Sequence, residues 1–300
     1  MNRLPFYHST WSARRWLTVT LSAVTVLTAG IIFAAPMAAM PLPVIGYTGC
    51  GGAEGAAIDA AYEARVVELV NQERANNGGL PPLKRVDALT LPARYHAADM
   101  GGDNYFKHDT YDRSTDALRY VCGAFDRMGR WYTDWRAVAE NIGAGYVSPE
   151  AVVASWMSGS GHRQNMLDAN FTEIGVGYYR GSGEYGVYWV VDFGARRGVF
   201  PLIINGEALV TTDQNVNIYI HGVWSEMRLR NDNGVWGEWQ PFSNSFRWVL
   251  AEIAGERTVS AEVRNGSASA MMSDTIQLDG VAINSPAEAH RVYLPAVTRK

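Results

Sequence analysis

Apolar residues recur every three or four positions in the first half of the chain. They do so over 58–70 and again over 89–100, where Leu89, Ala93, Ala97 and Met100 share this spacing. Such a period places the side chains on one face of a helix, so both segments are predicted to be helical. The turn residues that follow Asn76 end the first of these helices.

Capping residues predict two more helices. Ser148-Pro149-Glu150 combines a capping side chain, a proline suited to the first helical position and an acid in the first turn. Ser114 and Thr115 are also capping residues, and the apolar residues after them fit a helix as far as Phe125. We therefore expect a third helix after Thr115 and a fourth after Ser148.

The pattern changes to strands after the fourth helix. The segments 173–180 and 185–193 are rich in β-branched and aromatic residues, and Gly181-Ser182-Gly183 lies between them. This arrangement predicts a β-hairpin. Helices on both sides of a short sheet would form a three-layer α-β-α sandwich.

Beyond Arg197 the chain reads as strands alone. Short runs typical of strands alternate with turn residues, at 200–204, 216–220, 226–230, 247–250 and 257–263. This rhythm predicts an all-β sandwich over 200–282, and a domain boundary between Arg196 and Pro201. The segment 227–279, with Trp236-Gly237-Glu238-Trp239, also resembles immunoglobulin-like modules of bacterial surface and secreted proteins.

The N-terminus has the features of a targeting segment. Arg14-Arg15 precede an apolar run over 16–35, and small residues follow over 34–39. We interpret 1–39 as a cleaved signal peptide, with an uncleaved anchor and a twin-arginine route as alternatives. A linker rich in Pro and Gly covers 40–57, and the tail 283–300 lacks the residues of a sortase signal. The protein is therefore expected to be secreted or at the cell surface.

Composition narrows the classes of partner. The 300 residues are 47% hydrophobic and carry a net charge of −4, with an isoelectric point near 5.9. A chain of this length buries a sizeable core, and its acidic balance gives no reason to expect nucleic acid or an anionic membrane surface as a partner. No membrane association is expected beyond the N-terminal signal. Ten Trp and fifteen Tyr fit packing, and also faces that contact carbohydrate or protein.

The chain has only two cysteines, Cys50 and Cys122. An even pair in an exported chain is compatible with one disulfide. Two alternatives stay open from the sequence. Cys50 follows Tyr47-Thr48-Gly49 and would then be a lipid attachment site, or both thiols are unpaired.

Three short segments carry the candidate chemistry. They are Tyr105-Phe106-Lys107-His108, Ala139-Glu140-Asn141-Ile142-Gly143 and Gly161-His162-Arg163-Gln164-Asn165. Imidazole and carboxylate groups are suited both to metal binding and to acid–base work near neutral pH. Spacing alone does not show that these side chains meet.

These segments, in this order, resemble the bacterial branch of the CAP superfamily (cysteine-rich secretory proteins, antigen 5 and pathogenesis-related proteins). The resemblance covers about 58–197, and its other motifs are Val70-Asn71-Gln72-Glu73-Arg74, Ala97-Ala98-Asp99-Met100, Ala151-Val152-Val153-Ala154-Ser155-Trp156-Met157 and Phe171-Thr172-Glu173-Ile174-Gly175. Several ordered motifs over one domain are far more specific than a single short match. The resemblance implies the same three-layer α-β-α fold.

The resemblance also implies a pocket of two His and two acids, which places His108, Glu140 and His162 in it. The second acid of the family falls at Gly159 here, three residues after Trp156. With one ligand missing, Zn²⁺ is expected to bind weakly if at all, unless Asp109 turns inward. A purely structural polar cluster is the alternative. It would use the helix end at His162, where exposed carbonyls favour an imidazolium.

The expected function is extracellular binding of a lipid, a cell-wall component or a protein through this His/Glu-lined cleft. No cofactor is required, and Asn141 and Asn165 are expected to fix the loops of the cleft. The rival class is a metal-assisted hydrolase of peptide or ester bonds, with His108 and His162 on the ion and Glu140 as general base. Ser158-Gly159-Ser160-Gly161 lacks the context of a nucleophile elbow, so the sequence leans away from an enzyme.

Overall fold

A computed structural model describes residues 47–51, 57–115 and 117–280 of the chain. The predicted signal peptide and C-terminal tail lie outside these ranges, as does most of the predicted linker. None of the helices within the described ranges has the length and apolarity required to cross a membrane.

Five helices form in the first half of the described chain: α1 (Ala60–Asn76), α2 (Asp87–Gly102), α3 (Ala124–Met128), α4 (Pro149–Ser158) and α5 (Ser160–Leu167). Side chains cap two of them. Asp59 accepts a hydrogen bond from the Tyr62 N–H at 3.0 Å at the start of α1, and Ser148 accepts one from the Ala151 N–H at 3.2 Å at the start of α4. The predicted helices at 58–70, 89–100 and after Ser148 are therefore confirmed.

One mixed sheet lies among these helices. Its strand order is β1 (Lys84–Arg85), β5 (Glu173–Arg180), β6 (Val187–Arg196) and β4 (Trp135–Ala144). The pairs β5–β6 and β6–β4 are antiparallel, whereas β1 pairs with β5 in parallel. The predicted hairpin of 173–193 is confirmed, and β4 is left at the edge of the sheet.

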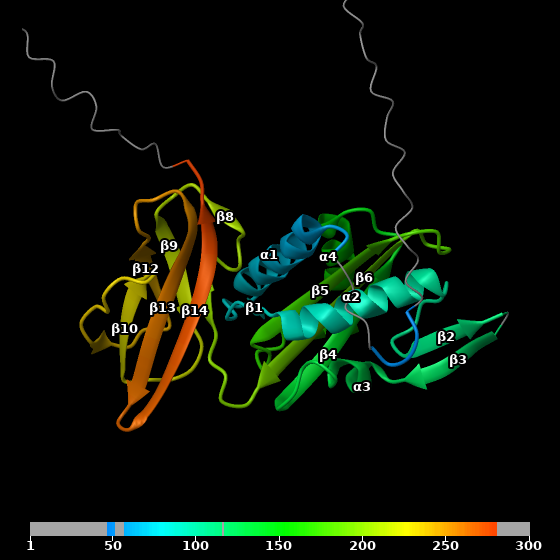
Figure 1. The fold of residues 1–300 in the computed structure, drawn as a ribbon, viewed down its shortest axis with the longest axis horizontal. Coiled ribbons are helices and arrows are strands. Elements are labelled where there is room, and N and C mark those ends of the chain that lie inside the picture. Colours follow the sequence, from blue (N-terminus) through cyan, green and yellow to red (C-terminus); the bar gives the residue numbers. More distant parts are fainter. Residues whose placement is uncertain (1–46, 52–56, 116, 281–300) are drawn as a thin grey trace, which may run out of the picture. The chain divides into compact units, whose positions relative to one another are not determined.

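Two hydrophobic clusters cover the two faces of this sheet, in the manner of a three-layer sandwich. One cluster joins α1, α4 and α5 to alternate residues of β5 and β6, and the other joins α2 to Ile142, Tyr188 and Val190. Figure 1 shows α1 and α4 together and α2 apart from them. The described part is thus an α+β fold with the predicted α-β-α layers.

Glycines let α2 approach the sheet closely. A Cβ on Gly175 would lie 2.1 Å from the backbone of Leu89, and one on Gly177 would lie 2.2 Å from the backbone of Ala93. Both distances are far below contact, so these two strand positions require glycine because of packing.

The helix predicted after Thr115 is wrong. Residues Thr110–Ser114 (β2) and Ala117–Cys122 (β3) pair as an antiparallel hairpin instead, and only α3 is helical. Tyr120 and Val121 favour strands over helices, and Tyr111 and Tyr120 pair across the two strands. Local capping signals were thus overridden by cross-strand pairing.

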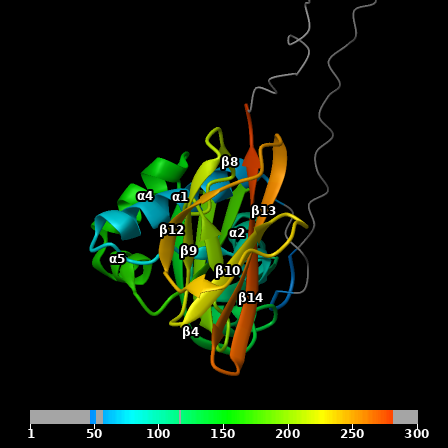
Figure 2. The same cartoon turned by 90° about the vertical axis from the view of Figure 1, so that its left-hand side faces the viewer.

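The second half of the described chain is all β, as predicted. One sheet has the order β11 (Gln240–Pro241), β10 (Glu226–Asn231), β13 (Gly255–Asn265), β14 (Ala268–Leu278) and β8 (Val210–Thr211). The other has the order β12 (Ser245–Val249), β9 (Asn215–Ile220) and β7 (Leu202–Ile204). Both sheets contribute alternate residues to one core, and Figure 2 shows their strands. Kinship with immunoglobulin-like modules stays a prediction.

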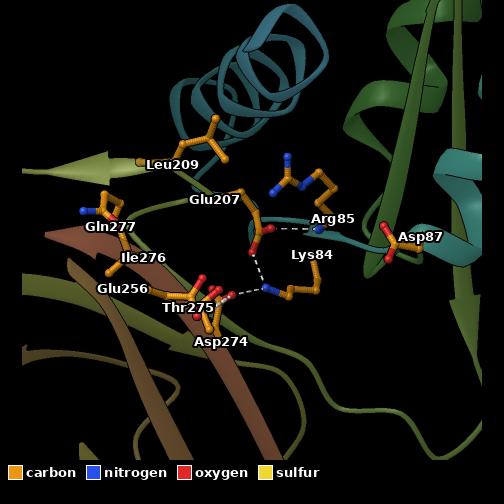
Figure 3. Close-up of a pocket in the computed structure, with 11 residues that line it drawn as sticks. Lys84, Arg85, Asp87, Glu207, Leu209, Glu256, Asp274, Thr275, Ile276 and Gln277 are labelled. Carbon is orange, nitrogen blue, oxygen red and sulfur yellow. Dashed lines mark hydrogen bonds and ion pairs between the residues drawn. The ribbon is translucent and has the colours of Figure 1, made fainter. Parts of the chain in front are cut away.

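Polar contacts join the two halves although their hydrophobic cores share no residue. The Asn71 amide donates to the Gly206 carbonyl at 2.9 Å. Lys84 on β1 donates to Glu207 at 2.9 Å and also to Asp274 on β14 (Figure 3). The domain boundary expected between Arg196 and Pro201 stays a prediction, as does the independent stability of each half.

Candidate functional site

His108, Glu140 and His162 reach one open cavity from three separate elements. His108 lies just before β2, Glu140 lies on the edge strand β4, and His162 lies on α5. All three line a cavity of about 520 Å³, together with Gly159, Ser160, Gly161, Gln164 and Asn165. The fold therefore brings the three candidate residues to a common surface.

Glu140 is buried and both of its oxygens are engaged. Its Oε1 accepts a hydrogen bond from His108 Nδ1 at 2.8 Å, and its Oε2 pairs with the guanidinium of Arg127. The His108 side chain itself is 53% exposed. Glu140 thus holds His108 with Nε2 as the ring nitrogen that remains for a ligand.

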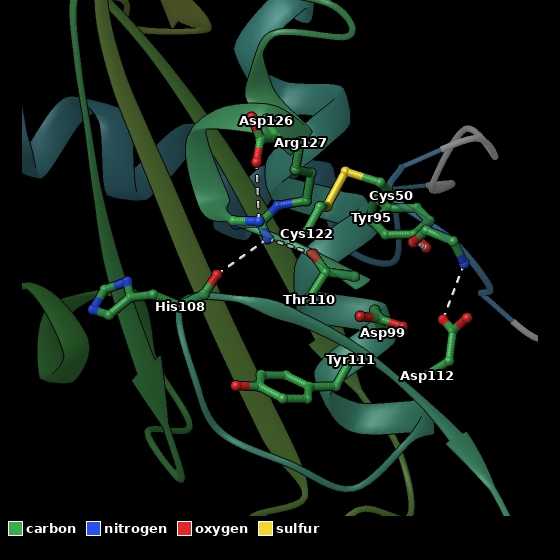
Figure 4. The surroundings of a disulfide bond; sticks show 12 residues. Cys50, Tyr95, Asp99, His108, Thr110, Tyr111, Asp112, Cys122, Asp126 and Arg127 are labelled. Atoms are coloured by element: carbon green, nitrogen blue, oxygen red, sulfur yellow. Dashed lines mark hydrogen bonds between the residues drawn. A yellow bond between two sulfur atoms is a disulfide. The ribbon is translucent and has the colours of Figure 1, made fainter. Parts of the chain in front are cut away.

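Arg127 is a site residue that the sequence did not reveal. It is fully buried, and besides Glu140 it donates to the His108 carbonyl at 3.1 Å and to Thr110 Oγ1 at 2.7 Å. Figure 4 shows its guanidinium between His108 and Thr110. Arginine side chains are mostly exposed in proteins, and Arg127 belongs to none of the motifs quoted above, so the sequence did not single it out.

Asp192 lies behind Glu140, as its cross-strand partner on β6. It is fully buried. Burial, and then the charge of Glu140, raise the pKa of Asp192 well above its usual range. Neither carboxyl oxygen of Asp192 has a hydrogen-bond partner among the described residues. An acid within the apolar run 187–193 was the sequence signal for this residue.

The two histidines differ in their electrostatics. The hydrogen bond to Glu140 raises the pKa of His108 despite partial burial. Burial, followed by the charge of His108, lowers the pKa of His162. Burial alone would raise the pKa of Glu140. The charge of Arg127, with further contributions from His96 and His108, instead holds this pKa well below its usual range. A proton is therefore favoured more on His108 than on His162.

His162 lies in the first turn of α5, which begins at Ser160, two residues after the end of α4 at Ser158. Its ring is thus near the C-terminal end of α4, as expected. Burial lowers the pKa of His162, which opposes the imidazolium expected beside the exposed carbonyls of that helix end.

Asn141 and Asn165 hold the wall of the cavity. The Asn141 amide donates to the His162 carbonyl at 3.0 Å, and the Asn165 amide donates to Asn141 Oδ1 at 2.9 Å and to the Glu140 carbonyl at 3.3 Å. These bonds tie α5 to β4, which is a positioning role.

The three candidate ligands do not form a compact set of metal-binding atoms. Within the described ranges, the one set of three such groups whose ligand atoms lie within 4.8 Å of one another is formed by other residues. Glu140 also has Arg127 beside it, which would repel a cation. Glu140 instead orients His108, whose imidazole lines the same cavity as that of His162.

Gly159 and Asp109, the two positions considered for the second acid of the pocket, lie on different cavities. A Cβ on Gly159 would lie 3.1 Å from His162 Nδ1, so the family's missing acid would stand next to this ring. Asp109 lies instead on an adjoining cavity of about 640 Å³. That cavity shares His108, Glu140 and Asn165 with the first and extends to Phe125, which is 53% exposed and was not singled out from the sequence. We call these two cavities together the cleft.

Cys50 and Cys122 are joined by a disulfide with a Cα–Cα distance of 5.8 Å (Figure 4). It connects the segment 47–51 to the end of β3. The same segment accepts a hydrogen bond from Tyr95 to the Gly49 carbonyl at 2.6 Å. His96 is buried on α2, and His221 is also buried, within 2.8 Å of the Pro82 carbonyl.

The fold and the cleft define the class of this segment. Residues 67–193 match the family model described as "CAP: Cysteine-rich secretory protein family". The segment is therefore a CAP domain, with the α-β-α layers described above.

Two curated relatives come from Bacillus subtilis. The uncharacterised protein YkwD is 40% identical over 134 residues, which cover 45% of this chain and 47% of YkwD. The uncharacterised membrane protein YlbC is 30% identical over 123 residues, covering 41% of this chain and 33% of YlbC. The chain thus spans less than half the length of each.

A solved structure is also similar. It is an extracellular protein containing a SCP domain from Bacillus anthracis, with 27% identity and a TM-score of 0.39. The match covers 46% of this chain and 42% of that one.

Proposed function

We propose that this chain is an exported CAP-domain protein that binds an extracellular lipid, cell-wall component or protein through the cleft. The observation that carries this proposal is the state of Glu140. Both of its oxygens are engaged by His108 and Arg127, which leaves His108, His162 and Phe125 as the groups that meet a ligand. A rigid polar floor with exposed imidazole and aromatic groups suits recognition.

The geometry favours binding over hydrolysis. A general base works best when its pKa lies near the working pH, and it must reach the proton that it removes. Glu140 is buried and its pKa lies well below the usual range because of Arg127. It is therefore poorly suited to the role of base in the rival hydrolase.

Export of the chain is part of the proposal. It rests on the N-terminal pattern of 1–39 and on the disulfide, a bond that persists in oxidising compartments. Mass spectrometry of protein recovered outside the cell tests it. A linked Cys50–Cys122 peptide is expected, and a diacylglycerol adduct on Cys50 would contradict the disulfide.

A binding assay tests the cleft itself. Purified protein is sedimented with isolated cell walls and, separately, with phospholipid vesicles. Phe125→Ala and His162→Ala should each reduce the bound fraction, because both side chains are partly exposed in the cleft. Val235→Ala serves as the control, since Val235 is 94% exposed and lies on the β-sandwich. Equal retention of all four proteins would contradict the proposal.

We further propose that a divalent ion such as Zn²⁺ binds weakly between His108 and His162. Two imidazoles, one of them oriented by a carboxylate, are fewer protein ligands than a structural zinc site has. His162→Ala should abolish the heat of Zn²⁺ binding with little change in the melting temperature. Gly159→Glu should strengthen binding, because the added carboxylate would stand beside His162. Absence of any binding heat in the wild type would contradict this.

A further inference from the structure

A second group of ionisable side chains lies outside the cleft, near the disulfide. Asp99 lies on α2, Asp103 follows the end of α2, and Asp112 lies on β2. One carboxylate oxygen from each lies within 4.8 Å of the others. Figure 4 shows Asp99 and Asp112 below the disulfide. Three separate positions in the sequence thus converge on one point.

Asp99 supplies the second observation. Its side chain is only 1% exposed, and while Oδ2 accepts a hydrogen bond from the Tyr105 hydroxyl, Oδ1 has no hydrogen-bond partner among the described residues. A buried carboxylate oxygen without a donor is costly unless something else satisfies it. A cation bound among the three carboxylates would satisfy this oxygen.

No cationic side chain of the described residues forms an ion pair with these three carboxylates. Arg113 lies close, but its guanidinium donates to the carbonyls of Asp103 at 2.5 Å and Asn104 at 2.9 Å. The three carboxylates therefore converge without an ion-pair partner among the described residues.

We propose that Asp99, Asp103 and Asp112 together bind one calcium ion. All three offer oxygen, which hard cations prefer, and neither nitrogen nor sulfur is present to favour zinc. Asp103 and Asp112 are only partly buried, so water completes the six to eight ligands that Ca²⁺ takes. Carboxylates on a helix, a loop and a strand suit its flexible coordination better than the strict octahedron of Mg²⁺.

The ion would also tie the N-terminal segment to the CAP domain. Asp112 Oδ1 accepts a hydrogen bond from the Gly49 N–H at 3.0 Å, next to the disulfide at Cys50. The Asp103 carboxylate accepts one from the Arg113 N–H at 2.7 Å. Fixing the two carboxylates therefore fixes the segment 47–51, the end of α2 and β2 together.

Calcium titration of the full chain, stripped of metal beforehand, tests the proposal. We expect one equivalent to bind with a dissociation constant of roughly 0.1 to 1 mM, the range of extracellular calcium modules. At 10 mM Ca²⁺ the melting temperature should rise by roughly 2 to 5 °C. Magnesium at the same concentration should give a smaller rise.

Isosteric variants locate the site. Asp99→Asn and Asp112→Asn should each weaken calcium binding by at least tenfold while the metal-free protein melts at the same or a higher temperature, because like charges are removed. Glu184→Gln is the matched control, since it removes one exposed charge from a nearby loop whose backbone N–H contacts Asn104 at 2.6 Å. His162→Ala should leave calcium binding unchanged.

The following results would overturn the proposal. The wild type shows neither binding heat nor a shift in melting temperature with Ca²⁺. Alternatively, Asp99→Asn and Asp112→Asn respond to Ca²⁺ as the wild type does, which would place any binding elsewhere. Equal affinity for Mg²⁺ would overturn the assignment to calcium.

Discussion

Arg127 determines the chemistry of the cleft although it does not line it. This fully buried guanidinium pairs with Glu140, and Glu140 in turn holds His108. Asp192 completes the buried set on the neighbouring strand. A buried charge network of this kind orients its members, but it depends on every partner because an unpaired buried charge is costly.

Arg127→Ala should therefore destabilise the protein strongly. It would leave Glu140 as an uncompensated buried carboxylate, for which we expect a loss of about 3 to 5 kcal/mol in the free energy of unfolding. Arg130 lies three residues away and its side chain is exposed, so Arg130→Ala should change the free energy of unfolding by less than about 0.5 kcal/mol. Urea denaturation measures both. Similar losses in the two variants would show that Arg127 is not a structural partner of Glu140.

At the scale of single elements, local sequence patterns predicted the correct helix or strand where tertiary packing favours the same structure. The hairpin of β5 and β6 was predictable from its β-branched residues, and α4 from its cap at Ser148. The hairpin of β2 and β3 was not predicted, because the capping residues Ser114 and Thr115 were weighed above the strand preference of Tyr120 and Val121, and because cross-strand pairing leaves no local signal. The contact between Arg127 and Glu140 was not predictable either, because it depends on how α3 packs against β4 and leaves no local pattern.

The contact between α2 and the sheet gives a prediction at this scale. In Gly175→Ala the added Cβ would lie 2.1 Å from the Leu89 backbone, so α2 must move away from the sheet. We expect a loss of about 1 to 3 kcal/mol or more in the free energy of unfolding. Gly161→Ala is the control, because nothing lies within 4 Å of the added atom and alanine favours the helix. Thermal melts compare the two, and an unchanged melting temperature in Gly175→Ala would refute the close packing.

For the whole molecule, the helical periodicity and the strand rhythm predicted an α-β-α domain followed by an all-β sandwich, and both are present in the described residues. The polar link between them was not predictable, because Lys84, Glu207 and Asp274 are far apart in the sequence. Lys84 donates to both carboxylates, and Glu207 also accepts the Arg85 N–H at 3.1 Å. Lys84 thus pairs with two buried acids, and acidic side chains outnumber basic ones in the cavity around them.

This imbalance predicts that stability depends on pH. Burial, and then the charge of Asp274, raise the pKa of Glu207 to about 7, although Lys84 and the Arg85 N–H act in the opposite direction. Arg85, Asp87 and Glu256 line the same cavity, so four acidic side chains there face two basic ones. Between its ordinary pKa of 4.5 and about 7, Glu207 binds a proton in the folded state that the unfolded state has released. The stabilisation is complete below pH 4.5 and is lost as the pH rises towards 7.

Glu207→Gln should remove this contribution. The difference between the unfolding free energies of the wild type and the variant should then change by about 1 to 3 kcal/mol between pH 4.5 and pH 7.5, with the wild type losing more as the pH rises. Using the difference cancels the titration of other buried acids, such as Asp192. Glu226→Gln, an acid on the surface of the sandwich that pairs with Arg264 at 2.7 Å, should leave the slope of the wild type almost unchanged. Parallel pH curves for the wild type and Glu207→Gln would show that Glu207 stays ionised beside Lys84, so that the link between the two halves is an ordinary salt bridge.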